Sequence, residues 1–134
     1  MGAGSALMLI TAVTANESKS ADSLCEQGLE FLSAGNAAEA ARAFRAAIAA
    51  DPGHVEAHHG LVRALRDAGQ LNQSVAAAMA LTVLTPEDPL AHTALSISLQ
   101  AAGHVPQAEA AAARARILEW KAQLNAPPDE ASLP

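Results

Sequence analysis

Three glycines at a constant interval are the feature that most limits how this chain can fold. Gly35, Gly69 and Gly103 are separated by 34 residues each time, and Pro52 and Pro86 share the same interval. A fixed period of this length indicates a repeat protein, in which each unit packs only against its neighbours. With Pro52 at position 32 of a unit, the repeats cover residues 21–54, 55–88 and 89–121.

Each unit has the pattern of a helical hairpin. An apolar-periodic segment ends at the glycine, which can adopt the left-handed conformation that terminates a helix, and a second helix follows and stops near a proline. Pro89 and Pro106 lie in the first turn of a helix, where a missing N–H is tolerated. We therefore expect six helices, at residues 21–33, 37–50, 55–68, 72–84, 89–101 and 105–123.

Composition agrees with helices and argues against a sheet. Hydrophobic residues make up 51% of the 134 residues, but aromatic residues only 2%, and tyrosine is absent. A core of small and aliphatic side chains suits closely packed helices, whereas strands favour aromatic and β-branched residues. Because one hairpin cannot bury its own apolar face, the units must stack. We expect an all-α fold, a short right-handed α-solenoid of three antiparallel helix hairpins over residues 21–123, with a flexible tail at 124–134.

Charge and cysteine content exclude several functions. A net charge of −6 leaves no basic stripe to neutralise phosphates, so we expect no nucleic acid partner. The single cysteine, Cys25, allows neither an internal disulfide nor a four-cysteine zinc site. The sequence has no phosphate-binding glycine loop, serine elbow or HExxH motif. We therefore expect no enzyme, no cofactor and no small-molecule substrate.

The N-terminal segment, residues 1–20, has two interpretations. Residues 6–13 are an apolar run that ends in small residues suited to a signal peptidase, but no lysine or arginine precedes it. The run is too short to span a bilayer. The segment is either a signal peptide of an exported protein or an apolar helix that docks on this protein or its partner. The missing basic residue favours the second interpretation and a cytoplasmic protein.

The first unit carries a pattern of small, aromatic and proline residues at Gly28, Phe31, Ala40, Phe44, Ala47 and Pro52. With this pattern and the 34-residue period, the repeats resemble the tetratricopeptide repeat family from residue 21 to about residue 121. The first unit agrees best with the family's pattern of small, aromatic and proline positions, and the other two units keep fewer of them. The resemblance implies a non-catalytic adaptor or accessory subunit that binds a peptide segment, or a subunit of a larger complex, in its concave groove. An assembly or secretion chaperone that holds a client transiently is the alternative, and an open-ended stack also allows homo-oligomers.

In members of this family the first helix of each unit lines the groove. When the family's groove positions are transferred to this sequence, the resemblance implies a groove with an apolar wall at each end and two arginines at the centre. Such a groove suits a peptide with aliphatic side chains and a carboxylate. Chaperone-binding members hold two carboxylates of their ligand with a clamp of lysine, asparagine and arginine side chains. This clamp is absent here, because the corresponding positions are Cys25, Leu29, Gly60, Leu90 and Ala94. The expected partner-binding residues are Cys25, Leu29, Leu32, His59, Arg63, Arg66, Leu90, Thr93 and Ile97.

The histidine-rich stretch of residues 49–60 raises the question of a metal site. His58 and His59 are adjacent on a helix and point about 100° apart, and His54 precedes that helix. A metal site needs three or four converging ligands, so we interpret His58 and His92 as packing residues and His54 as a polar turn residue. Metal binding remains a minor alternative. Cys25 lacks the partners of a catalytic nucleophile, and we expect a semi-exposed thiol at the groove edge.

Overall fold

The computed structural model describes residues 21–127, and this range consists of helices joined by short turns. Residues 21–33 are helical. The helices that follow are α2 (Ala37–Ala50), α3 (Val55–Asp67), α4 (Leu71–Leu84), α5 (Pro89–Ala101) and α6 (Val105–Asn125). The bounds of all these helices agree with the sequence-based expectation to within two residues, and the all-α class is confirmed.

The two ends of the chain lie partly outside this range. The expected apolar segment, residues 1–20, and residues 128–134 of the expected tail are not among the described residues. Helix α6 continues to Asn125, two residues beyond the end expected from the sequence.

Each hairpin turn uses a glycine with a positive φ. Gly35, Gly69 and Gly103 have φ angles of 80°, 77° and 85°, in the region where a side chain would be strained. In each turn the glycine N–H donates to the carbonyl oxygen three residues earlier, and the next N–H donates to the carbonyl oxygen five residues earlier, at 2.8–3.1 Å. These paired bonds are the Schellman motif. The predicted left-handed glycine caps are confirmed, and they recur at the same position of every unit.

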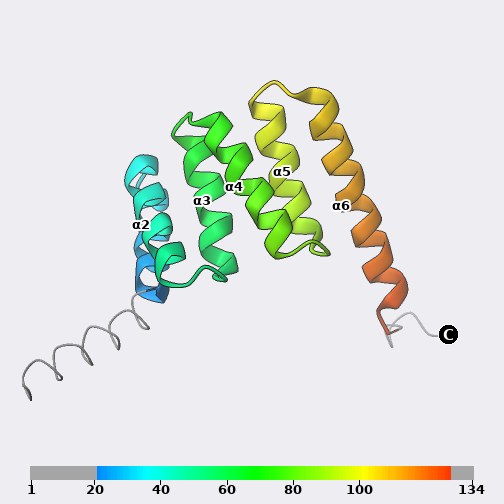
Figure 1. The fold of residues 1–134 in the computed structure, drawn as a ribbon, viewed down its shortest axis with the longest axis horizontal. Coiled ribbons are helices and arrows are strands. Elements are labelled where there is room, and N and C mark those ends of the chain that lie inside the picture. Colours follow the sequence, from blue (N-terminus) through cyan, green and yellow to red (C-terminus); the bar gives the residue numbers. More distant parts are fainter. Residues whose placement is uncertain (1–20, 128–134) are drawn as a thin grey trace, which may run out of the picture.

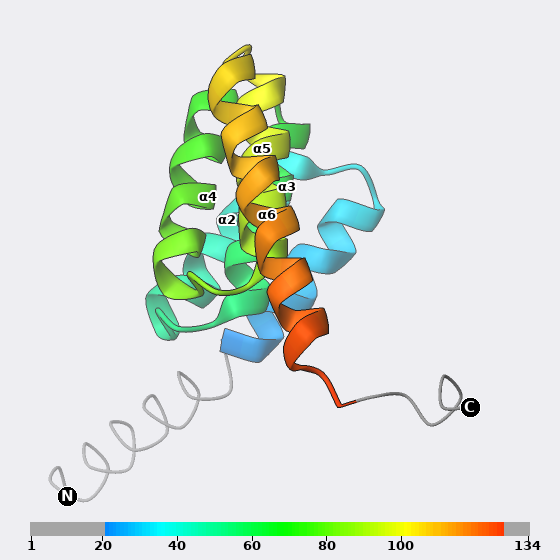
Figure 2. The same ribbon diagram turned by 90° about the vertical axis from the view of Figure 1, so that its right-hand side faces the viewer.

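The helices stack in chain order into a curved row (Figure 1). Each of α2 to α5 packs against the helix that follows it, and α3 also packs against α5, whereas α4 has no such close approach to α2 or α6 within the described range. The first helices of the units are therefore closer together than the second helices, so α3 and α5 lie on the inner, concave side. Figure 2 looks along the row from the α6 end and shows α3 and α4 in separate layers. The predicted α-solenoid is confirmed.

A phenylalanine ring fills the joint between the first two units. Phe44 on α2 is 0% exposed, and the backbone of both Gly28 and Gly60 lies against its ring. A Cβ atom at Gly28 would come within 2.6 Å of the ring, and one at Gly60 within 2.4 Å. Glycine at both helical positions therefore makes room for the ring. The cluster around it contains Cys25, Ala40, Ala41, Ala47, Ala57, Leu61, Ala64 and Leu65.

The joint between the second and third units contains buried hydroxyl groups. Ser74 on α4 and Ser98 on α5 are both 0% exposed. The Ser74 hydroxyl donates to the carbonyl oxygen of Val62 at 2.9 Å, and its oxygen lies 2.7 Å from the Ser98 hydroxyl oxygen. Because Ser74 uses its proton for Val62, Ser98 is the donor within the serine pair. Val62, Ala78, Leu81 and Ala91 form the apolar cluster of this part of the core.

Candidate functional site

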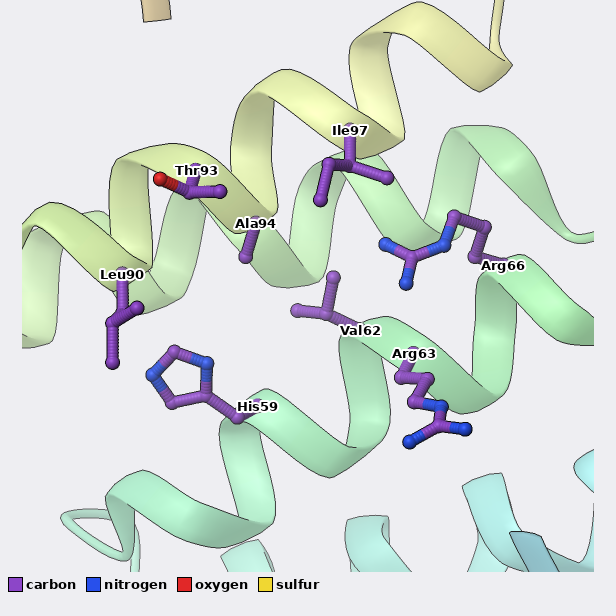
Figure 3. Close-up of a pocket in the computed structure, with 8 residues that line it drawn as sticks. All are labelled: His59, Val62, Arg63, Arg66, Leu90, Thr93, Ala94 and Ile97. Atoms are coloured by element: carbon purple, nitrogen blue, oxygen red, sulfur yellow. The ribbon is translucent and has the colours of Figure 1, made fainter. Parts of the chain in front are cut away.

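A hollow opens on the concave side between α3 and α5 (Figure 3). Its volume is about 280 Å³. Each helix contributes residues at the i, i+3, i+4 and i+7 spacing, which places them on one face of that helix. The residues that line the hollow are His59, Val62, Arg63 and Arg66 on α3, and Leu90, Thr93, Ala94 and Ile97 on α5.

One wall of this hollow is apolar and the other is mainly basic. Leu90 is 63% exposed and Ile97 is 46% exposed on α5. Across from them, the guanidinium of Arg66 reaches toward Ile97, whereas that of Arg63 is turned away from α5 (Figure 3). The ring of His59 lies at the end of the hollow where Leu90 is found (Figure 3). Exposed aliphatic side chains of α5 thus line the same hollow as the cationic group of Arg66.

The two arginines differ in how their charge is compensated. Arg63 Nε lies 3.8 Å from Asp67 Oδ2, and both side chains are largely exposed, so this pair contributes little to stability. Arg66 is half-buried, and it has no ion-pair partner within residues 21–127. A guanidinium has five N–H donors in a planar fork that matches a carboxylate. Arg66 therefore offers an uncompensated anion-binding group beside apolar surface.

Most of the expected groove residues meet in this hollow. Six of the nine line it, namely His59, Arg63, Arg66, Leu90, Thr93 and Ile97.

Two residues of the hollow were not predicted. Val62 is 1% exposed and belongs to the core cluster of the second joint, and Ala94 carries only a methyl group. Buried apolar and small residues on a helix ordinarily indicate packing, and the family resemblance singles out Ala94 only as a position where the clamp of chaperone-binding members is absent. Helix periodicity could have identified Val62, because a residue three positions after His59 lies on the same face of α3.

The other three expected residues lie elsewhere. Cys25 and Leu29 line a separate hollow of about 360 Å³ near the start of the described chain. Leu32 is half-buried and packs against the core around Phe44. The expected apolar wall at this end of the groove is wrong, because the remaining lining residues are acidic or imidazole side chains. They are Asp22, Glu26, His54 and Glu56.

Cys25 requires a further correction. We expected a semi-exposed thiol, but Cys25 is 2% exposed and packs in the cluster around Phe44. Burial raises the pKa of the Cys25 thiol to about 11, and the nearby carboxylates of Glu56, Asp22 and Glu26 act in the same direction. A protonated, buried thiol is a poor nucleophile. The side chain is therefore part of the core.

Two histidines make the same hydrogen bond in successive units. His58 Nε2 lies 2.8 Å from the carbonyl oxygen of Pro52, and His92 Nε2 lies 2.9 Å from that of Pro86. A carbonyl oxygen can only accept, so Nε2 carries the proton in both rings and is not free to bind a metal. These side chains fasten the start of each helix to the preceding turn.

His54 links three segments of the fold. Its Nδ1 accepts a hydrogen bond from the Ala57 N–H at 3.1 Å and caps α3, and its Nε2 lies 2.8 Å from Asp22 Oδ1. The acceptor role of Nδ1 places the proton of the neutral ring on Nε2, which donates to Asp22. Within residues 21–127, no group of three or more His, Cys, Asp or Glu side chains is arranged to hold a metal ion.

Solved structures with the same fold share little sequence with this chain. The TPR2AB domain in the pHSP90 complex of yeast Sti1 matches with a TM-score of 0.75 at 15% identity, over 90% of this chain and 48% of that one. MamA matches with a TM-score of 0.72 at 17% identity, over 78% and 61%. The type III secretion translocator chaperone SycD of Yersinia enterocolitica matches with a TM-score of 0.70 at 18% identity, over 75% and 76%.

These similarities show the fold alone, because the identities are low. The chain spans 58% of the length of the matching chain in the CopN–Scc3 complex and 61% of that of MamA. No curated protein sequence matches the chain significantly. Among the helices of residues 21–127, none combines the length and apolar character needed to cross a membrane.

A family model described as tetratricopeptide repeat matches residues 31–97, half of the chain. The match includes the turns at Gly35 and Gly69 and all eight residues that line the hollow between α3 and α5. The 34-residue period, the repeated glycine caps and the stacked hairpins are the features that this family shares. The chain therefore belongs to the tetratricopeptide repeat family.

Proposed function

We propose that the chain is a non-catalytic adaptor or accessory subunit that binds a segment of a partner protein in the hollow between α3 and α5. One observation carries the proposal: Leu90 and Ile97 are exposed beside the half-buried guanidinium of Arg66, which has no ion-pair partner among residues 21–127. Covering exposed aliphatic side chains is favourable, and such surface on a small protein commonly marks an interaction site. Family membership supports a role in protein–protein interaction.

The dimensions and charge of the hollow favour a peptide segment over a flat protein surface. A volume of about 280 Å³ accommodates one or two side chains. An aliphatic side chain of the partner packs between Leu90 and Ile97, over the small side chain of Ala94. A carboxylate of the partner accepts hydrogen bonds from Arg66, which fixes the position of the segment along the groove.

The test begins with native mass spectrometry of the protein isolated from its own cells, which identifies a stably bound partner by mass. Binding of that purified partner is then compared between variants. Ile97→Asp and Arg66→Gln should each weaken binding at least tenfold. The matched controls are Val83→Asp, at a residue 81% exposed on α4, and Arg42→Gln, at a side chain 76% exposed; both should bind within twofold of the unmodified protein.

The control variants show whether a loss of binding is specific to the hollow. Circular dichroism checks that every variant keeps its helical content. Unchanged binding by Ile97→Asp and Arg66→Gln, together with weaker binding by Val83→Asp, would move the interaction site to the outer layer of helices.

Transient holding of a client is the alternative role. It is supported by the likeness to the translocator chaperone SycD, which extends over about three quarters of both chains, 75% and 76%. The same mass measurement separates the two roles. An accessory subunit is found in the final assembly of its partner, whereas a chaperone is found only with the unassembled client.

A further inference from the structure

We propose that residues 6–13 of the same chain occupy the hollow between α3 and α5 when no partner is bound. The segment then acts as an internal ligand that a partner must displace. This regulatory consequence rests on the proposed function, whereas docking of the segment does not depend on any partner.

The chemistry of the segment matches the apolar wall of the hollow. Residues 6–13 read ALMLITAV and carry no charge, with four consecutive large apolar side chains at residues 7–10. The hollow presents Leu90 and Ile97, which are 63% and 46% exposed. Contact between the two removes apolar surface from water on both sides.

The length of the connecting chain allows this contact. Residues 14–20 separate the apolar run from the described helix of residues 21–33, and seven extended residues span at most about 25 Å. Residue 21, Val55 and Pro89 occupy the same position of successive units, so the first helices start at the same edge of the row. Axes of packed helices are about 8 to 10 Å apart, which puts the start of α5 about 20 Å from residue 21.

One end of the hollow lies toward this edge. His59 and Leu90 lie near the starts of α3 and α5, so the segment meets the hollow before it must extend further along the helices.

A second apolar hollow is out of reach for the same connection. It has a volume of about 430 Å³ and lies in the third unit and its joint with α4, lined by Met79, Leu95, Leu99, Gln107, Ala110 and Ala111. From residue 21 a chain must cross to the outer layer and then pass at least two unit spacings. With helices about 10 Å in diameter, that path is about 30 to 40 Å, longer than the connection.

Paramagnetic broadening in the full-length protein tests the docking. Thr14→Cys, in a Cys25→Ala background, places a single spin label directly after the apolar run. We expect strong broadening of the Leu90 and Ile97 methyl signals and little effect on those of Ile117 and Leu124 on α6. Broadening confined to α6, or absent from all four residues, would overturn the proposal.

A mixing experiment separates docking within one chain from docking on a second copy. Spin-labelled protein without isotopes is mixed with isotope-labelled protein that carries no spin label. Docking within the chain predicts no broadening of Leu90 or Ile97 in the mixture. Broadening there as strong as in the single-chain experiment would show that the segment binds another copy, and would overturn occupation in the same chain.

Substitutions in the segment connect docking to partner binding. In the full-length protein, Leu7→Asp with Leu9→Asp should shift the Leu90 and Ile97 methyl signals and raise partner affinity at least threefold. The matched control, Ala3→Asp with Ser5→Asp, adds the same charge outside the run and should do neither. Unchanged methyl signals in the first variant refute docking and leave the proposed function intact. Shifted signals, with partner binding insensitive to Ile97→Asp, refute the proposed function and leave docking intact.

Discussion

The ring of Phe44 fits against the backbone of Gly60 because residue 60 has no side chain. A Cβ atom there would lie 2.4 Å from the ring, closer than carbon atoms pack. Phe44 belongs to the first unit and Gly60 to the second, so this contact sets how closely the two units approach. The ring also lies against Gly28 of its own unit. One aromatic side chain thus defines packing both within and between hairpins.

Gly60→Ala should lower the free energy of unfolding. Alanine favours a helix by about 1 kcal/mol over glycine, but overpacking in a core typically costs about 1 to 3 kcal/mol, and the fully buried ring has little space to move away. We expect a net loss of about 1 to 2 kcal/mol in urea unfolding. Gly53→Ala is the control, because its Cβ would meet only Asp51 Oδ1, at 3.7 Å. Equal stability of both variants would contradict the tight fit of Phe44.

The buried serines should respond unequally to substitution. Ser74→Ala removes the acceptor of the Ser98 hydroxyl and leaves that group buried without this bond, which costs about 1 to 3 kcal/mol. Ser98→Ala leaves Ser74 bonded to the Val62 carbonyl oxygen, so its loss should be smaller. Urea unfolding of the two variants and of the double variant gives the comparison. A larger loss for Ser98→Ala would contradict the assigned donor.

Alkaline pH should destabilise the protein through Cys25. The pKa of the folded thiol is raised from 9.0 to about 11, so the folded state holds this proton more tightly than the unfolded state. The resulting stability is complete below pH 9 and is lost as the pH rises through 11. At about 1.4 kcal/mol per pKa unit, the loss between pH 8 and 10.5 is about 2 kcal/mol. The free energy of unfolding of Cys25→Ala should fall by about this amount less over the same pH range. An equal decrease in the variant and the unmodified protein would contradict the raised pKa of Cys25.

The repeat architecture could be read from the sequence because its signals are local. A positive φ at Gly35 is required by the turn itself, and a proline after a helix prevents its continuation wherever the rest of the chain lies. The interval between such residues then specifies the unit. Helix boundaries followed from the same residues, which is why they agree closely with the structure.

The site was harder to predict because it depends on what surrounds each side chain. Unit position placed Cys25 on the groove side of its helix, but the cluster around Phe44 covers it. Conversely, Val62 reads as a core residue and is one, yet it also forms the floor of the hollow. The pairing of Ser74 with Ser98, 24 residues later, arises only when the helices pack. Such contacts form only in the tertiary structure, and no local sequence pattern indicates them.

Arg66→Met should change stability and partner binding in opposite directions. The half-buried guanidinium has no ion-pair partner within residues 21–127, so an apolar side chain of similar length removes a partly desolvated charge and leaves no carboxylate unpaired. We expect the free energy of unfolding to rise by about 0.5 to 1 kcal/mol, as is common when a binding residue is replaced, and partner affinity to fall at least tenfold.

Arg63→Met, at a side chain 66% exposed and 3.8 Å from Asp67, is the control and should leave stability nearly unchanged. Urea unfolding and calorimetric titration measure both quantities. Reduced stability of Arg66→Met would mean that the guanidinium supports the fold, and the uncompensated charge could then no longer be assigned to a partner.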